Sequence, residues 1–414
     1  MDYIINGGNR LNGEIAVCGA KNCALPLLGA SILTDEEIIL RNCPQIVDVE
    51  NMIALLQSMG KKVKRQGDSV YISGGLATTN APKTLATLLR GSALILGSTV
   101  ARYHQIELPL PGGCAIGSRP MDIHLLGLEA MGVTVVSCDE VIHCNGVPVG
   151  TEYNMRFASV GATENLVCAA VLAKGDTVLT NVATEPEVVA LEEMLVCMGA
   201  QIDGLGKTEL YIKGVNSLHG VEFDVIPDRI VTATYLSAAV AAGGKVTVTD
   251  CCPSHLGVFV NMLSTRFTTK VYDNAITLQA DNQPSDYGKI ITAPYPFFPT
   301  DMQSLVMSLA AFSDRGTTVI NERLFENRLQ HNANELSKMG AKISVDKNKA
   351  KITGSKLYGA KVKTGDLRGG AGLVIAGLNA SGTTVVQDVS HINRGYFNLA
   401  ESLRNLGADI KVSN

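Results

Sequence analysis

Six stretches along the chain share one pattern of hydrophobic and polar residues. In each, an apolar helical segment ends in a short tail, usually closed by glycine, and a strand rich in Val or Ile follows. A steady spacing of such segments over a whole chain is the mark of an internal repeat. The tails end at Gly60, Gly132, Gly199, Thr268, Gly340 and Gly407, which are 72, 67, 69, 72 and 67 residues apart.

Each repeat also contains an alternating strand that runs into a polar loop, and a helix rich in Ala, Leu and Gly. Alternation with period two predicts a strand with one buried face, and a helix that is apolar all round is a buried helix. Polar residues open these helices, so their N-terminal ends are expected to face a polar group. The strands are predicted at residues 36–42, 105–110, 177–181, 245–250, 317–321 and 383–388, and the helical runs include 92–101 and 303–311.

The simplest architecture for this pattern is α/β, with six βαβαβ-like units in which apolar helices lie inside and sheets surround them. Three units on either side of Pro227 predict two similar domains. We expect residues 21–227 to form the first, and residues 1–20 with 228–414 to form the second, because the N-terminal strand has no counterpart in the first half. Clefts between domains are common ligand sites, so the active site is expected in a cleft between the two.

Composition and charge exclude several classes of protein. With 46% hydrophobic and 18% charged residues, the 414-residue chain is not disordered. Its net charge of -4 provides no basic surface for nucleic acid. The N-terminus lacks the pattern of a signal peptide and no apolar run is long enough to insert into a membrane, so a cytoplasmic location is expected. Ten Cys without a C-x-x-C pair predict neither a disulfide scaffold nor a structural zinc.

The segment 111–120 is the most informative local motif. Three Gly and two Pro surround a single cysteine, Cys114, which lies five residues before Arg119. The segment could be a plain turn around an inert thiol. We favour a functional interpretation, because a cysteine on an exposed loop near a cation has a lowered pKa and raised reactivity.

Several cations occupy similar positions in their repeats, at loops or at helix starts. Any one of them could be a solvated surface charge. Their equivalent placement instead indicates an anionic ligand, since Arg binds phosphate or carboxylate through two donors and Lys adds a compact charge. The residues are Lys21, beside Asn22, and Arg90, Arg119, Arg328 and Arg394.

Asp301 stands at the start of a predicted buried helix. It could stabilise the first turn of that helix, or it could be a base that takes a hydroxyl proton, and the local sequence does not separate the two. The pair Glu185 and Glu187 has the same ambiguity and favours a helix start. His124 and His391 have no second ligand at metal spacing, so we expect them to support loops through hydrogen bonds.

The chain resembles the enolpyruvyl transferases that open bacterial peptidoglycan synthesis, and the resemblance runs from end to end. Several motifs in the same order carry it. They are Lys21-Asn22, Cys114-Ala115-Ile116-Gly117-Ser118-Arg119, Ser159-Val160-Gly161, Asp228-Arg229, Pro299-Thr300-Asp301, Phe325-Glu326-Asn327-Arg328, Asp366-Leu367-Arg368 and His391-Ile392-Asn393-Arg394.

The resemblance implies a two-domain inside-out α/β barrel and a specific reaction. The enolpyruvyl group of phosphoenolpyruvate would pass to the 3-hydroxyl of UDP-N-acetylglucosamine by addition and elimination, with release of phosphate. These two substrates are the implied partners, and no metal, organic cofactor or protein partner is indicated. In the family, the residue matching Cys114 protonates or traps phosphoenolpyruvate and is alkylated by fosfomycin, and the one matching Asp301 is the proposed base.

The resemblance also assigns residues by position. Cys114, Asp301, Lys21 and Arg394 would be catalytic. Phosphoenolpyruvate would contact Lys21, Arg90, Arg119, Arg328, Arg368 and Arg394. The sugar nucleotide would contact Asn22, Arg90, Arg119, Ser159, Gly161, Asp301 and Leu324.

Two departures from the family pattern bear on nucleotide binding. Phe157 stands where some members carry Lys, and Val231 stands where an acid is usual. Two alternatives stay open, and the two departures motivate the second of them. One is enolpyruvyl transfer to shikimate 3-phosphate, which shares the architecture but not the cysteine loop, and the other is a non-catalytic relative that binds the nucleotide and regulates a partner.

Overall fold

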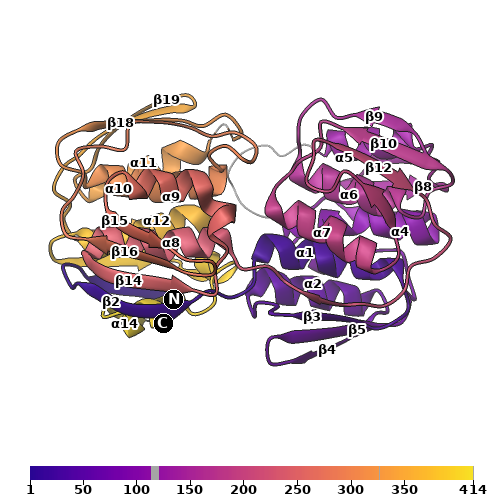
Figure 1. Ribbon diagram of the computed structural model, residues 1–414, viewed down its shortest axis with the longest axis horizontal. Helices are drawn as coiled ribbons and strands as arrows, with labels where there is room; N and C mark the ends of the chain where they lie inside the picture. The colour runs from indigo at the N-terminus through magenta and orange to yellow at the C-terminus, as the bar shows by residue number, and fades with distance from the viewer. Residues whose placement is uncertain (113–120, 326, 414) are drawn as a thin grey trace. The chain divides into compact units, whose positions relative to one another are not determined.

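The computed structural model describes residues 1–112, 121–325 and 327–413 (Figure 1). These residues form two compact units. We call residues 19–112 and 121–226 the N-terminal lobe, and residues 1–18 and 227–413 the C-terminal lobe. Each lobe has its own hydrophobic core, and neither core includes residues from the other lobe.

The N-terminal lobe contains three sheets, with strand orders β13-β3-β5-β4, β6-β8-β7 and β11-β12-β10-β9. The strands are β3 (Ile38–Arg41), β4 (Lys62–Gln66), β5 (Ser69–Ser73), β6 (Gln105–Pro109), β7 (Thr134–Cys138), β8 (Val141–Asn145), β9 (Glu152–Asn154), β10 (Asp176–Thr180), β11 (Gln201–Asp203), β12 (Glu209–Lys213) and β13 (Glu222–Asp224). The helices are α1 (Lys21–Ala30), η1 (Ser31–Leu33), α2 (Val47–Ser58), α3 (Lys83–Ala86), η2 (Arg90–Leu94), α4 (Ile95–Tyr103), α5 (Asp122–Ala130), α6 (Val160–Ala170) and α7 (Pro186–Cys197).

The C-terminal lobe also contains three sheets, with orders β15-β16-β14-β2, β17-β18-β20-β19 and β21-β22-β1-β23. The strands are β1 (Asp2–Asn6), β2 (Leu11–Ala16), β14 (Gly244–Thr249), β15 (Thr268–Val271), β16 (Ile276–Ala280), β17 (Lys289–Ile291), β18 (Thr317–Asn321), β19 (Lys342–Asp346), β20 (Lys349–Thr353), β21 (Lys361–Lys363), β22 (Thr383–Gln387) and β23 (Asp409–Ser413). The helices are α8 (Arg229–Ala242), η3 (Pro253–Leu256), α9 (Gly257–Ser264), α10 (Thr300–Ala311), α11 (Arg328–Lys338), α12 (Leu367–Asn379), α13 (Ser390–Asn393) and α14 (Leu399–Asn405).

The six sheets are variants of one unit, which confirms the repeat that the spacing predicts. In four of them a central strand pairs in parallel with one neighbour and antiparallel with a strand of a hairpin, as β18 does with β17 and β20, and in the sheet of β22 the N-terminal and C-terminal strands β1 and β23 take the place of the hairpin. The sheet of β6 keeps only the antiparallel part, and a single parallel bridge between Asn80 and Glu107 stands for the missing strand. The N-terminal strand β1 lies between β22 and β23 and is antiparallel to both.

Buried helices form the centre of each lobe, and the sheets lie outside them (Figure 1). α8 and α12 have almost no exposed residue, and α4 and α6 are nearly as buried. A helix without a polar face must be covered on all sides, and the strands cover it with their alternate, apolar residues. This is the arrangement expected from the apolar helical runs in the sequence.

The glycine that closes most of the repeat tails is needed for the backbone conformation at that position. Five of the six tail positions adopt a positive φ, between 79° for Gly132 and 119° for Gly60, which glycine adopts without steric cost. A residue in this conformation ends the helix and turns the chain into the next strand. The fourth repeat has no such glycine, and its helix α9 ends through hydrogen bonds from the N–H groups of Arg266 and Phe267 to the carbonyl of Leu263.

Candidate active site

The C-terminal lobe brings one carboxylate and two arginines together at the N-terminal ends of three helices. Asp301 lies in the first turn of α10, Arg328 begins α11, and Arg368 is the second residue of α12. A guanidinium nitrogen of Arg328 lies 2.9 Å from Asp301 Oδ1, and one of Arg368 lies 3.5 Å from Asp301 Oδ2. Both arginine side chains are at most 4% exposed, whereas that of Asp301 is 27% exposed. The carboxylate is thus held by buried cations and still reaches solvent.

Local sequence accounts for the position of each group. Asp366 is the N-cap of α12 and accepts hydrogen bonds from the N–H groups of Arg368 and Gly369 at 2.9 and 3.0 Å. This cap starts the helix where Arg368 points at Asp301. An acid in the first turn of α10 also interacts favourably with the helix dipole. Both interpretations of Asp301, helix stabiliser and available carboxylate, are therefore compatible with its position.

Arg368 is held from a second side by an aromatic residue. The ring of Tyr396 lies 5.6 Å from its guanidinium carbon, and the Tyr396 hydroxyl is 2.9 Å from Thr234 Oγ1. Burial by itself would lower the pKa of Arg368, but the carboxylate of Asp301 raises it above its usual range. Arg368 is therefore a permanent cation in the interior of the lobe.

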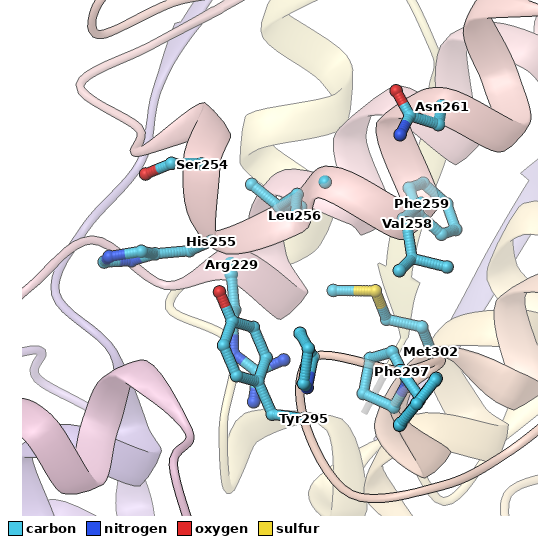
Figure 2. Close-up of a pocket in the computed structure, with 13 residues that line it drawn as sticks. Arg229, Ser254, His255, Leu256, Val258, Phe259, Asn261, Tyr295, Phe297 and Met302 are labelled. Carbon is cyan, nitrogen blue, oxygen red and sulfur yellow. The ribbon is translucent and has the colours of Figure 1, made fainter. Parts of the chain in front are cut away.

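A cavity of about 240 Å³ opens beside this cluster in the C-terminal lobe (Figure 2). Arg229, the first residue of α8, lines one end with its guanidinium carbon 5.7 Å from the centre of the Tyr295 ring. Met302, the residue after Asp301, lies at the other end near Phe297, which is 65% exposed. The cavity thus combines a cation at the start of α8 with aromatic walls, and through Met302 it adjoins the helix α10 that carries Asp301.

In the N-terminal lobe, the predicted cations begin helices as expected. Lys21 is the first residue of α1, and its Nζ lies 2.6 Å from the buried carboxylate of Asp48 on α2. Asn22 follows it, half-buried. Arg90 begins η2 and is also half-buried.

A neutral histidine lies near Arg90. His124 Nδ1 is 2.9 Å from the amide nitrogen of Asn165, which also donates to the carbonyl of Gly161. Burial lowers the pKa of His124 to about 4, and the positive charge of Arg90 contributes. His124 is therefore uncharged at neutral pH, with Nδ1 accepting and Nε2 carrying the proton. The expected hydrogen-bonding role is observed, although its partner is a helix and not a loop.

The predicted nucleotide residues of this lobe lie at the start of α6. Ser159 is the N-cap residue, and Gly161 follows in the first turn. A side chain at Gly161 would come within 3.1 Å of His124 Cε1, so glycine lets the two helices approach. Phe157, the first departure from the family pattern, is 42% exposed just before this helix.

The structure brings together only part of the predicted set. Asp301, Arg328 and Arg368 contact one another, while Leu324 and Arg394 are half-buried in loops of the same lobe. Cys114 and Arg119 lie outside the described residues. Val231, the second departure, is buried in α8, and its N–H donates to the N-cap Asp228.

Sequence analysis missed several polar residues that hold these groups. Tyr396 lies two residues after the motif that ends at Arg394, and Asp48 and Asn165 lie in helices with no local signal. Asp366 carried a signal, because an acid two residues before Arg368 is a typical N-cap. The missed residues are Asp48, Asn165, Thr300, Glu322, Asp366 and Tyr396.

Within residues 1–112, 121–325 and 327–413, no three His, Cys, Asp or Glu side chains are grouped as metal ligands would be. Over the same residues, no helix has both the length and the apolar character that a membrane crossing requires.

Comparison with known proteins decides the family. Residues 5–411 match the family described as EPSP synthase (3-phosphoshikimate 1-carboxyvinyltransferase). The chain belongs to this family.

The chain is also similar, over nearly its whole length, to relatives whose names differ from the family description. The chain is 42% identical over 412 residues to UDP-N-acetylglucosamine 1-carboxyvinyltransferase 2 of Caldanaerobacter subterraneus subsp. tengcongensis, covering 99% of this chain and 98% of the relative. It is 44% identical to UDP-N-acetylglucosamine 1-carboxyvinyltransferase of Cellvibrio japonicus, again covering 99% and 98%.

Solved structures agree on the fold. The crystal structure of the enolpyruvyl transferase NikO from Streptomyces tendae matches with a TM-score of 0.89 and 24% identity, covering 99% of this chain and 98% of that one. EPSP synthase from Acinetobacter baumannii matches over the full length of both chains with a TM-score of 0.75 and 18% identity. The two-domain inside-out α/β barrel implied by the sequence is thereby confirmed.

Proposed function

We propose that this protein transfers the enolpyruvyl group of phosphoenolpyruvate to the 3-hydroxyl of UDP-N-acetylglucosamine and releases phosphate, in the cytoplasm, as the first committed step of peptidoglycan synthesis. The observation that carries the proposal is identity of 42 to 44% over nearly the whole of both chains with relatives that bear this activity in their names. The family match spans residues 5–411, so the range it covers contains the positions of all the proposed site residues.

The charged cluster of the C-terminal lobe supports the chemistry. Addition of a hydroxyl to the enol phosphate of phosphoenolpyruvate needs a base for the hydroxyl proton, an acid for the methylene carbon, and cations beside the phosphate that leaves. Asp301 is a partly exposed carboxylate and suits the base. Arg328 and Arg368 supply fixed positive charge on both sides of it. Cys114 is the proposed acid.

The remaining assignments form part of the same proposal. Lys21 and Arg394 complete the catalytic set. Phosphoenolpyruvate is bound by Lys21, Arg90, Arg119, Arg328, Arg368 and Arg394. UDP-N-acetylglucosamine is bound by Asn22, Arg90, Arg119, Ser159, Gly161, Asp301 and Leu324.

Phosphate release tests the proposal. Purified protein is incubated with phosphoenolpyruvate alone, with UDP-N-acetylglucosamine added, or with shikimate 3-phosphate added. We expect release only with the sugar nucleotide, and its loss in Cys114→Ala at neutral pH. Release with shikimate 3-phosphate instead would assign the activity named in the family description. Nucleotide binding in calorimetry without turnover would contradict both and favour a regulatory protein.

A further inference from the structure

Glu322 is a buried carboxylate directly after β18 that none of the proposed chemistry uses. Its side chain is fully buried, and among the described residues no Lys, Arg or His forms an ion pair with it. It is held by four hydrogen bonds instead. Oε1 accepts from Thr292 Oγ1 at 2.8 Å and from the N–H groups of Leu324 and Phe325 at 2.9 and 3.3 Å, and Oε2 accepts from Thr300 Oγ1 at 2.8 Å. A buried carboxylate with this many donors is a fixed acceptor.

The carboxylate sets the direction of both threonine hydroxyls. A carboxylate has no proton to give, so Thr292 and Thr300 must each donate to Glu322. The lone pairs of each hydroxyl then face an N–H donor. Thr300 Oγ1 accepts from a guanidinium nitrogen of Arg328 at 2.9 Å, and Thr292 Oγ1 accepts from the N–H of Arg323 at 2.9 Å.

Each threonine hydroxyl thus forms a hydrogen-bonded relay from Glu322 to an N–H donor. Only the relay through Thr300 leads to the proposed active site. Arg328 uses one terminal nitrogen for Thr300 and the other for Asp301 Oδ1 at 2.9 Å. The orientation of this buried guanidinium is thus fixed at both ends. The Thr292 relay ends on a backbone N–H and does not reach Asp301.

We propose that Glu322 is a positioning residue for enolpyruvyl transfer. Through Thr300 it orients Arg328 and hence Asp301, and through the N–H groups of Leu324 and Phe325 it shapes the loop proposed to bind the nucleotide. The role rests on the proposed function. Small displacements of a reacting group lower the rate strongly, so an effect on turnover is expected although Glu322 touches no substrate.

Steady-state kinetics of four variants tests the proposal, with phosphate release measured at saturating phosphoenolpyruvate and UDP-N-acetylglucosamine. Glu322→Gln keeps the shape but directs an amide donor at Thr300, where the hydroxyl proton then has no acceptor. We expect Glu322→Gln and Thr300→Val to lower kcat roughly ten- to a hundredfold. Thr300→Ser keeps the hydroxyl and is expected to restore kcat.

Thr292→Val is the matched control, because it removes a hydrogen bond to the same carboxylate without touching the Arg328 relay. It is expected to lower the thermal midpoint as Thr300→Val does, while kcat stays within about twofold of the parent. Equal kcat in Thr292→Val and Thr300→Val would overturn the proposal. This comparison can be made even if Glu322→Gln does not fold. A parent without sugar-dependent release contradicts the proposed function and the role of Glu322 with it. An active parent with unaffected Glu322→Gln contradicts only the role of Glu322.

Discussion

Two polar clusters, one in each lobe, are built on opposite principles. In the C-terminal lobe, the groups are charged, and Asp301 lies between the buried guanidinium groups of Arg328 and Arg368. In the N-terminal lobe, His124 and Asn165 are neutral and join α5 and α6 through hydrogen bonds. A buried charge needs a partner of opposite charge, whereas a buried neutral group needs only hydrogen bonds and close packing. The first cluster should therefore respond to loss of charge, and the second to steric change and to protonation.

Removing the carboxylate charge of the C-terminal cluster should have the largest effect. Asp301→Asn takes away the proposed base and one partner of each buried arginine, so kcat is expected to fall about 10²- to 10⁴-fold. Sugar-dependent phosphate release measures it, with circular dichroism to check the fold. Asp314→Asn, which changes an exposed acid of the same lobe, is the control and should be fully active. Similar activity in both variants would contradict the role of Asp301.

Packing of the central helices should differ between the lobes. A side chain at Gly97 on α4 would lie 1.9 Å from the carbonyl oxygen of Asn165, whereas one at Gly372 on α12 would lie 2.9 Å from the carbonyl oxygen of Ser304. Gly97→Ala is expected to lower the free energy of unfolding by about 3 kcal/mol and Gly372→Ala by about 1 kcal/mol. Gly257→Ala has open space and is the control. Urea unfolding followed by circular dichroism measures the loss of unfolding free energy in each variant. A larger loss in Gly372→Ala than in Gly97→Ala would show that the helices of the N-terminal lobe accommodate an added methyl group more easily.

Acid should destabilise the N-terminal cluster through His124. The pKa of His124 is about 4 in the folded protein and about 6.5 when unfolded, so between these values the unfolded state binds the proton more strongly. Stability is unaffected above pH 6.5 and falls as the pH drops toward 4, by about 2 kcal/mol at pH 5.

His124→Gln should remove this part of the pH dependence. Unfolding free energies of the parent and the variant at pH 7 and pH 5 test it, with His219→Gln, a change at an exposed histidine, as the control. An equal loss on acidification in all three proteins would show that His124 does not titrate in this range.

The smallest effect is expected from a neutral hydrogen bond inside the charged cluster. Tyr396→Phe removes the hydroxyl that lies 2.9 Å from Thr234 Oγ1, while Thr234 keeps its bond to the carbonyl of Ile230. The free energy of unfolding should fall by about 1 kcal/mol. Tyr272→Phe changes an exposed tyrosine and should have no effect on the same thermal denaturation curve. A loss as large as that of Gly97→Ala would mean that the Tyr396 hydroxyl contributes more to the stability of the Arg368 cluster than one hydrogen bond to Thr234 does.

Predictions from the sequence succeeded where neighbouring residues carry the signal. The helix that begins at Thr300 places Asp301 in its first turn, and Lys21 and Arg90 begin helices as the pattern of polar residues before apolar runs predicts. The supporting residues were not predictable in the same way. Glu322 bonds to Thr292 and Thr300, which lie 30 and 22 residues away, and no local pattern shows that a loop will place them together.

By itself, the sequence determined the six repeats, the α/β class and the residues that begin the buried helices. These follow from hydrophobic periodicity and from glycine at helix ends, which act over a few residues and recur every 67 to 72 positions. Only the tertiary structure decided which charges meet. Arg368 lies 67 residues from Asp301, and their contact depends on how α10 and α12 pack within the lobe. Whether a buried polar group is charged or neutral depends on such distant neighbours, and so Asp301 became a paired anion and His124 a neutral hydrogen-bonding residue.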